Sequence, residues 1–147
     1  MDLTTPLLTK AELLKLAGIP STTFNNWRIR GLIPLKALGC EKVSLTTCKY
    51  SHLVAAYCAA LSYHTGSKRK QYVDVLKSEF SSVAKDGYCP ENLTIAISAM
   101  GKGPDCGAFE NYGEALRYGG NQCLYVNFGQ LIQKAAEHMK LLITKSK

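Results

Sequence analysis

The chain has 147 residues and a formal net charge of +7 at pH 7, with 46% hydrophobic and 20% charged residues. This length allows one domain with a modest core or a small module with an appendage, and the composition is ordinary for a globular protein. No stretch reaches the apolar length of a membrane span, and the beginning of the chain lacks the pattern of a signal peptide. We therefore expect a cytoplasmic, nucleoid-associated protein with no membrane partner.

The first elements expected along the chain are two short helices joined by a tight turn. Thr9 and Glu12 have the spacing of a capping box, and Leu8 and Leu13 have that of a hydrophobic staple. Gly18 can adopt the left-handed conformation that ends a helix. This pattern predicts a first helix that begins after Thr9 and a turn at Gly18.

The second helix is expected from Ser21, as its cap, to Gly31. Phe24 and Trp27 lie one turn apart and should face the first helix. An Asn amide can pair with adenine, and an Arg guanidinium can pair with guanine or grip phosphate. The candidate DNA-binding residues of this segment are Ser21, Thr22, Thr23, Asn25, Asn26, Arg28 and Arg30. The alternative is a solvated polar face on an ordinary helical hairpin.

A β-hairpin is expected next, between Pro34 and Lys49, because β-branched residues surround Gly39. Its candidate contacts to phosphate or to the minor groove are Lys36, Lys42 and Lys49. A helix over residues 51–65 should follow, with Leu53, Val54, Tyr57, Ala60 and Leu61 on its buried face. His52 and His64 are expected at the surface or rim of that helix.

Residues 7–65 resemble the winged helix-turn-helix of MerR-type regulators and the related excisionase-like domains. The resemblance rests on the segments Leu8–Leu13, Gly18–Ile19, Thr23–Trp27 and Gly31–Pro34, followed by Lys49-Tyr50-Ser51 with Leu53. It implies that the second helix enters the major groove of DNA and that the hairpin is the wing. Two departures are that Asn25 stands where the family usually has Arg, and that the wing lacks its usual Arg.

Positive charge is concentrated in the part of the chain that carries this resemblance. Residues 1–80 contain 11 Lys and Arg against 5 Asp and Glu, whereas residues 81–147 contain 7 against 6. The first part therefore has a net charge of +6 and the second of +1, so a polyanion should bind the first. The Lys68-Arg69-Lys70 run indicates either a nearby phosphate or a solvated basic run.

Beyond this run, we expect a helix over residues 67–85 with an apolar stripe of Tyr72, Leu76, Phe80 and Val83. The last third should contain strands at residues 93–100 and 123–128, a turn or loop over Gly101–Gly107 and a short helix over residues 111–118. An amphipathic helix over residues 130–144 should end the chain. Its stripe from Leu131 to Ile143 either forms a dimer interface or packs on the chain's own strands.

The six cysteines show no CxxC pair and no close histidine partner, so most should be free, buried thiols that behave as small apolar residues. Cys58, in an alanine-rich run, is of that type. Because some MerR-type regulators sense metals or oxidants through cysteines beyond the DNA-binding module, the resemblance also implies a sensing alternative for Cys89, Cys106 and Cys123.

The predicted fold class is therefore mainly α with small β elements. We expect a winged helix-turn-helix module at residues 1–66, a connecting helix at 67–86 and an α+β dimerisation or partner-binding region at 87–147. The predicted function is a sequence-specific, MerR-like transcription regulator of bacterial or phage type. Its expected partners are double-stranded DNA, a second copy of the chain and a protein such as RNA polymerase.

The first alternative is an architectural DNA-binding protein, such as an excisionase or the DNA-recognition subunit of a phage packaging motor. The second is a thiol- or metal-responsive regulator. We expect no enzymatic activity, no cofactor and no metal, because no catalytic, metal-binding or nucleotide-binding motif is present.

Overall fold

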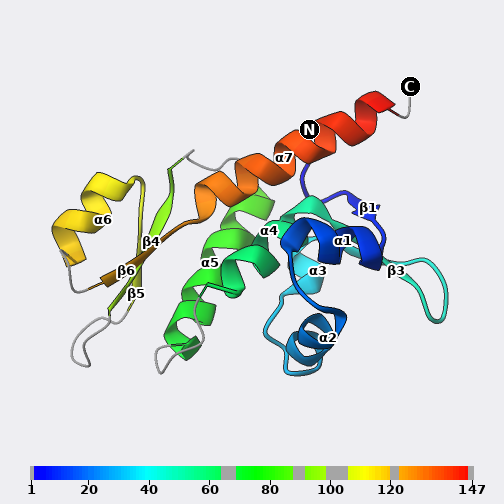
Figure 1. Cartoon of the computed structure of the whole chain (residues 1–147), viewed down its shortest axis with the longest axis horizontal. Helices are drawn as coiled ribbons and strands as arrows, with labels where there is room; N and C mark the ends of the chain where they lie inside the picture. Colours follow the sequence, from blue (N-terminus) through cyan, green and yellow to red (C-terminus); the bar gives the residue numbers. More distant parts are fainter. Residues whose placement is uncertain (1, 64–68, 88–91, 99–105, 120–122, 146–147) are drawn as a thin grey trace.

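The computed structural model of the chain describes residues 2–63, 69–87, 92–98, 106–119 and 123–145. These residues form mostly helices, together with two small antiparallel sheets (Figure 1). The predicted class, mainly α with small β elements, is confirmed.

The first two helices form as the local signals predict. Strand β1 (Pro6–Leu8) leads into α1 (Lys10–Ala17), and the capping box is present in both directions. Glu12 N donates to Thr9 Oγ1 at 3.2 Å, and Thr9 N donates to Glu12 Oε1 at 3.0 Å. Gly18 has φ of 70°, which turns the chain toward the next helix without the strain that a Cβ would bring.

Helix α2 (Ser21–Ile29) begins one residue earlier than expected. The prediction that Ser21 caps it is wrong. Pro20 occupies the N-cap position and supplies no side-chain hydrogen bond, because its fixed φ suits entry into a helix even without a capping oxygen. At the other end, Gly31 N donates to Arg28 O and Leu32 N to Trp27 O, a Schellman pair of bonds around a left-handed Gly31.

The predicted hairpin is confirmed, and it belongs to a three-stranded sheet. Strands β2 (Cys40–Lys42) and β3 (Cys48–Ser51) pair antiparallel, and β1 adds to the other edge of β3 in the order β1-β3-β2. A single helical turn, α3 (Leu35–Leu38), precedes the hairpin. Neither α3 nor β1 was predicted, because both are too short to show a periodic pattern.

Helix α4 (His52–Leu61) forms the centre of the molecule, and nine of its ten residues are buried. The five residues predicted for its inner face are among them. The prediction that His52 lies at the surface or rim is wrong: its side chain is fully buried, and its Nε2 lies 2.9 Å from Nδ1 of His138. His64 lies outside the described residues.

Helix α5 (Arg69–Asp86) packs its predicted stripe of Tyr72, Leu76, Phe80 and Val83 into the core. It lies between the N-terminal elements and a second sheet (Figure 1). That sheet has the order β5-β4-β6 and contains β4 (Thr94–Ser98), β5 (Cys106–Phe109) and β6 (Cys123–Asn127). Helix α6 (Tyr112–Gly119) covers one face of this sheet.

The loop predicted over Gly101–Gly107 is wrong at its end. Cys106 and Gly107 belong to β5 and pair with Ile97 and Ala96 of β4. Glycine lowers strand propensity in a sequence, but here the pairing with β4 outweighs that preference. Residues 101–105 lie outside the described ranges.

Helix α7 (Phe128–Lys145) runs back from the second sheet along α4 (Figure 1). Ile132, Ala135 and Met139 from its stripe are buried there. One continuous core therefore extends from Leu8 to Ala135. The inner part of the stripe is covered within the chain, by α4 more than by the strands.

Candidate nucleic-acid interface

Helix α2 is anchored by two aromatic side chains and leaves its outer face open. Phe24 is fully buried and makes an edge-to-face contact with Tyr50 of β3, with ring centroids 5.4 Å apart. Trp27 is 6% exposed. Both rings are buried on the inner side of α2, whereas their contact with the first helix stays a prediction. Because both rings face inward, the residues between and beside them are turned outward.

All ten candidate DNA-binding side chains are exposed or half-buried. Those that are exposed are Ser21, Thr22, Asn26, Arg28, Arg30, Lys36, Lys42 and Lys49; Thr23 and Asn25 are half-buried. The outer face of α2 also carries Ile29, which is 78% exposed. This face therefore offers one apolar group among amides, hydroxyls and guanidinium groups.

Asn25 has a partner within the chain. Lys10 Nζ, at the start of α1, donates to Asn25 Oδ1 at 2.9 Å. Bidentate pairing with adenine uses both the oxygen and the nitrogen of an amide. To pair in this way, Asn25 would have to share its oxygen between adenine and Lys10, or break its hydrogen bond with Lys10. Asn26, which is exposed, is the better placed of the two amides for a base edge.

Arg28 lies where α2 meets the hairpin. Burial is the main cause that raises the pKa of Cys40 to about 11, and the neighbouring Cys48 thiol raises it further, whereas the Arg28 guanidinium acts in the opposite direction. Burial likewise raises the pKa of Tyr50, against the effect of Arg28. The charge of Arg28 is thus close to the base of the hairpin. The Cys40 thiol remains protonated at neutral pH. Neither Cys40 nor Cys48 forms a disulfide.

The C-terminal end of α2 meets α5 in a groove with three basic side chains. The groove, of about 360 Å³, is lined by Arg30, Lys70 and Lys77 together with Asp74. Lys77 Nζ donates to Gly31 O at 2.9 Å, which places a cation at the negative end of α2. Arg30 and part of the basic run at the start of α5 therefore lie along one groove.

The three predicted lysines beyond α2 separate into two locations. Lys42 and Lys49 are exposed on β2 and β3 of the hairpin, and Lys49 lies opposite Glu41 in the strand register. Lys36, on α3, lines a different cavity with Thr4, Ser81 and Lys85. The structure therefore groups Lys36 with α5 and the N-terminal segment.

Sequence reasoning missed the roles of Lys10 and Lys77. Lys10 lies 15 residues before Asn25, and Lys77 lies 46 residues after Gly31. No local spacing rule connects residues at such distances, so only the packing of α1 and α5 around α2 could reveal them.

The thiol alternative stays a prediction, because only some of its cysteines lie within the described residues. Cys58 is fully buried, as predicted, and burial raises its pKa to about 12. Cys123 is half-buried and free, whereas Cys89 and the side chain of Cys106 lie outside what the structure describes. Among the described side chains, no group of three or more His, Cys, Asp or Glu could hold a metal ion.

In the described ranges, no helix has both the length and the apolarity needed to cross a membrane. No protein-family model, curated protein or solved structure matches the chain significantly. The geometry of α2 and its surroundings is therefore the basis for the function proposed below.

Proposed function

We propose that the chain is a sequence-specific DNA-binding protein of the winged helix-turn-helix type, with α2 as the helix that enters the major groove. The observation that carries this proposal is the outer face of α2, where Asn26, Arg28 and Arg30 are all exposed while Phe24 and Trp27 fix the helix from inside. Helices that read DNA need this combination of a rigid inner face and a polar, basic outer face.

The side chains on this face suggest how the contacts divide. Asn26 suits adenine, and the exposed methyl groups of Ile29 suit the methyl group of thymine. Arg28 and Arg30 suit guanine or phosphate. Lys42 and Lys49 on the hairpin would add phosphate contacts beside the groove.

The proposed role is transcription regulation, because a helix of this kind gives a protein a preference for particular sites. DNA bending without control of a promoter is the alternative outcome. A regulator changes the output of a nearby promoter, whereas an architectural protein changes the path of the DNA.

The test is DNA binding by variants of the full chain, measured by fluorescence anisotropy on a duplex selected from a random-sequence pool. Asn26→Ala should bind the selected duplex and scrambled DNA with more similar affinities. Arg28→Ala and Arg30→Ala should weaken binding to all duplexes and reduce the salt slope by about one per lost phosphate contact.

Two exposed lysines of α7 offer a matched control for the loss of charge. Lys134→Ala/Lys140→Ala removes two positive charges from a different surface. It should leave the affinity for the selected duplex nearly unchanged. Equal weakening by this control and by Arg28→Ala/Arg30→Ala would show that net charge, and not α2, determines binding.

A further inference from the structure

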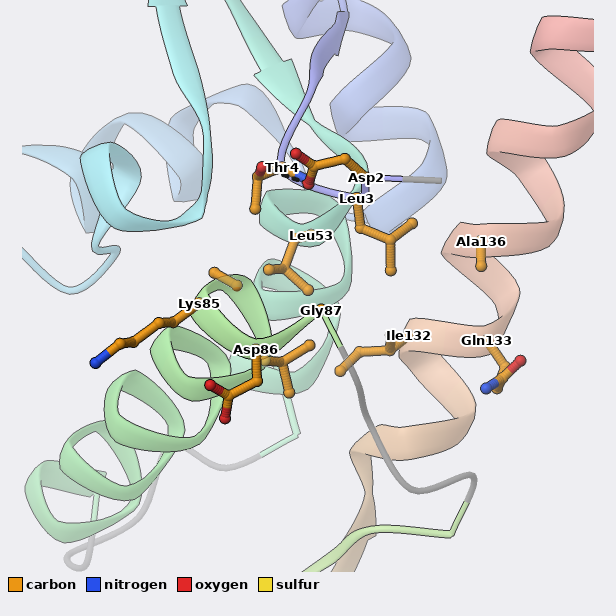
Figure 2. Close-up of a pocket in the computed structure, with 12 residues that line it drawn as sticks. Asp2, Leu3, Thr4, Leu53, Lys85, Asp86, Gly87, Ile132, Gln133 and Ala136 are labelled. Carbon is orange, nitrogen blue, oxygen red and sulfur yellow. Dashed lines mark hydrogen bonds between the residues drawn. The ribbon is translucent and has the colours of Figure 1, made fainter.

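A cavity lies away from α2, between the N-terminal segment, the end of α5 and α7 (Figure 2). Its volume is about 610 Å³, within the range of small-molecule sites. We call it the α5–α7 cavity. Four parts of the chain that are far apart in the sequence line it: residues 2–4, Leu53 of α4, residues 83–87, and Ile132, Gln133 and Ala136 of α7.

The inner wall of the α5–α7 cavity is apolar and belongs to the core. Leu53 is fully buried, and Val83 and Ile132 are also buried. Figure 2 shows Leu3, Leu53 and Ile132 around the middle of the cavity. Because these side chains are held by the core, the wall can accept the apolar body of a ligand without rearranging.

Two carboxylates lie at the rim of the cavity, on opposite sides of Leu53 in Figure 2. Asp2 accepts hydrogen bonds from Thr4 N at 2.9 Å and from Thr4 Oγ1 at 2.5 Å. The hydroxyl bond, followed by the backbone bond, lowers the pKa of Asp2, so its carboxylate is ionised at neutral pH. Asp86 adds a second carboxylate at the rim.

The end of α5 adds to this negative potential. The helix stops beside the cavity at Asp86, followed by Gly87 with φ of 70°, and the C-terminal end of a helix carries about half a negative charge. Lys85 is the lining residue with a positive charge, and Figure 2 shows its ammonium group and the carboxylate of Asp86 both directed away from Leu3 and Ile132.

From this arrangement we propose that the α5–α7 cavity binds a small organic cation, with its ammonium group near Asp2 and the end of α5 and its apolar body against Leu53 and Ile132. An organic anion would meet the carboxylate of Asp2 and a helix C-terminus. A neutral molecule would gain the apolar contacts alone. The proposal does not depend on DNA binding.

In the test, the ¹⁵N-labelled full chain is titrated with the probe 2-phenylethylammonium, and binding is followed by the amide chemical shifts of the protein. Two probes of similar size serve as comparisons: 3-phenylpropionate, an anion, and 2-phenylethanol, which is neutral. The ammonium probe should shift amides of Leu3, Leu53, Gly87 and Ile132, with a Kd on the order of 1 mM for so small a molecule. The anion should shift none of them, and the alcohol should bind more weakly.

Variants separate charge from shape. Asp2→Asn/Asp86→Asn should lower the affinity for the ammonium probe by about fivefold, as expected for exposed charges. Ala136→Leu should abolish binding by filling the cavity. Glu137→Gln removes an exposed carboxylate of α7 that does not line the cavity and should change nothing.

Three results would overturn the proposal. They are equal binding of the anion or the alcohol, shifts confined to residues outside the cavity, and equal weakening by Glu137→Gln and by Asp2→Asn/Asp86→Asn.

Discussion

Lowering the pH should destabilise the protein through one buried histidine. His52 is fully buried between α4 and α7, its Nε2 is paired with His138, and its Nδ1 has no hydrogen-bond partner among the described residues. Burial, followed by the nearby His138, lowers the pKa of His52 from 6.5 to about 4, while Glu12 acts weakly in the opposite direction.

The sign and size of the effect follow from this shift. In the unfolded chain His52 gains a proton near pH 6.5, whereas in the folded chain it resists protonation until about pH 4. Between these two pH values the unfolded state therefore binds more protons than the folded state. The contribution of neutral His52 to the free energy of unfolding is fully present above pH 6.5 and is lost as the pH decreases. Between pH 7.5 and pH 5 the loss is about 2 kcal/mol, which is a large part of the stability of a small domain.

The assay is urea unfolding followed by the fluorescence of Trp27, the one tryptophan of the chain, at pH 7.5 and at pH 5. His52→Leu should remove about 2 kcal/mol of the pH dependence, whatever its effect at pH 7.5. His138→Gln should keep most of that dependence, because burial of His52 is the larger cause. If His52→Leu and the unchanged protein lose the same stability on acidification, His52 is not held neutral in the folded state and the reasoning fails.

Three further predictions concern stability and association. Trp27→Ala should cost about 3–5 kcal/mol of unfolding free energy, because it empties a buried site on the inner side of α2; an unchanged melting temperature with lost DNA binding would instead place Trp27 in the groove. Gly39→Ala should cost more than Gly18→Ala in the same urea assay: both glycines have positive φ, but a Cβ at Gly39 would lie 2.0 Å from Thr4 O, whereas nothing lies within 4 Å of one at Gly18. Equal costs would show that the N-terminal segment moves aside. The chain should form dimers through the outer part of α7, so Leu141→Lys, at a position 61% exposed, should shift sedimentation toward the monomer; a wild-type monomer at micromolar concentration, with and without DNA, would contradict this.

Local chemistry made the N-terminal elements predictable. The capping box at Thr9 and the left-handed Gly18 and Gly31 define helix ends through atoms a few residues apart, so their patterns are visible in the sequence. The inward positions of Phe24 and Trp27 followed from helical periodicity.

Long-range contacts were not predictable in the same way. His52 and His138 are 86 residues apart, and only the packing of α7 on α4 brings them together. The bond from Lys10 to Asn25 likewise depends on how α1 lies against α2, and it decides which of two adjacent amides is better placed for the proposed base contact. A single sequence carries no record of such pairings.

The most direct test of the central proposal is a map of the DNA-binding surface. Amide chemical shifts of the ¹⁵N-labelled full chain would be followed during titration with the selected duplex. The largest changes should fall on residues 21–30 and on the β2–β3 hairpin, with α6 and the outer face of α7 unaffected. Changes concentrated on α6, α7 or the second sheet, with residues 21–30 unmoved, would contradict the proposal that α2 reads DNA.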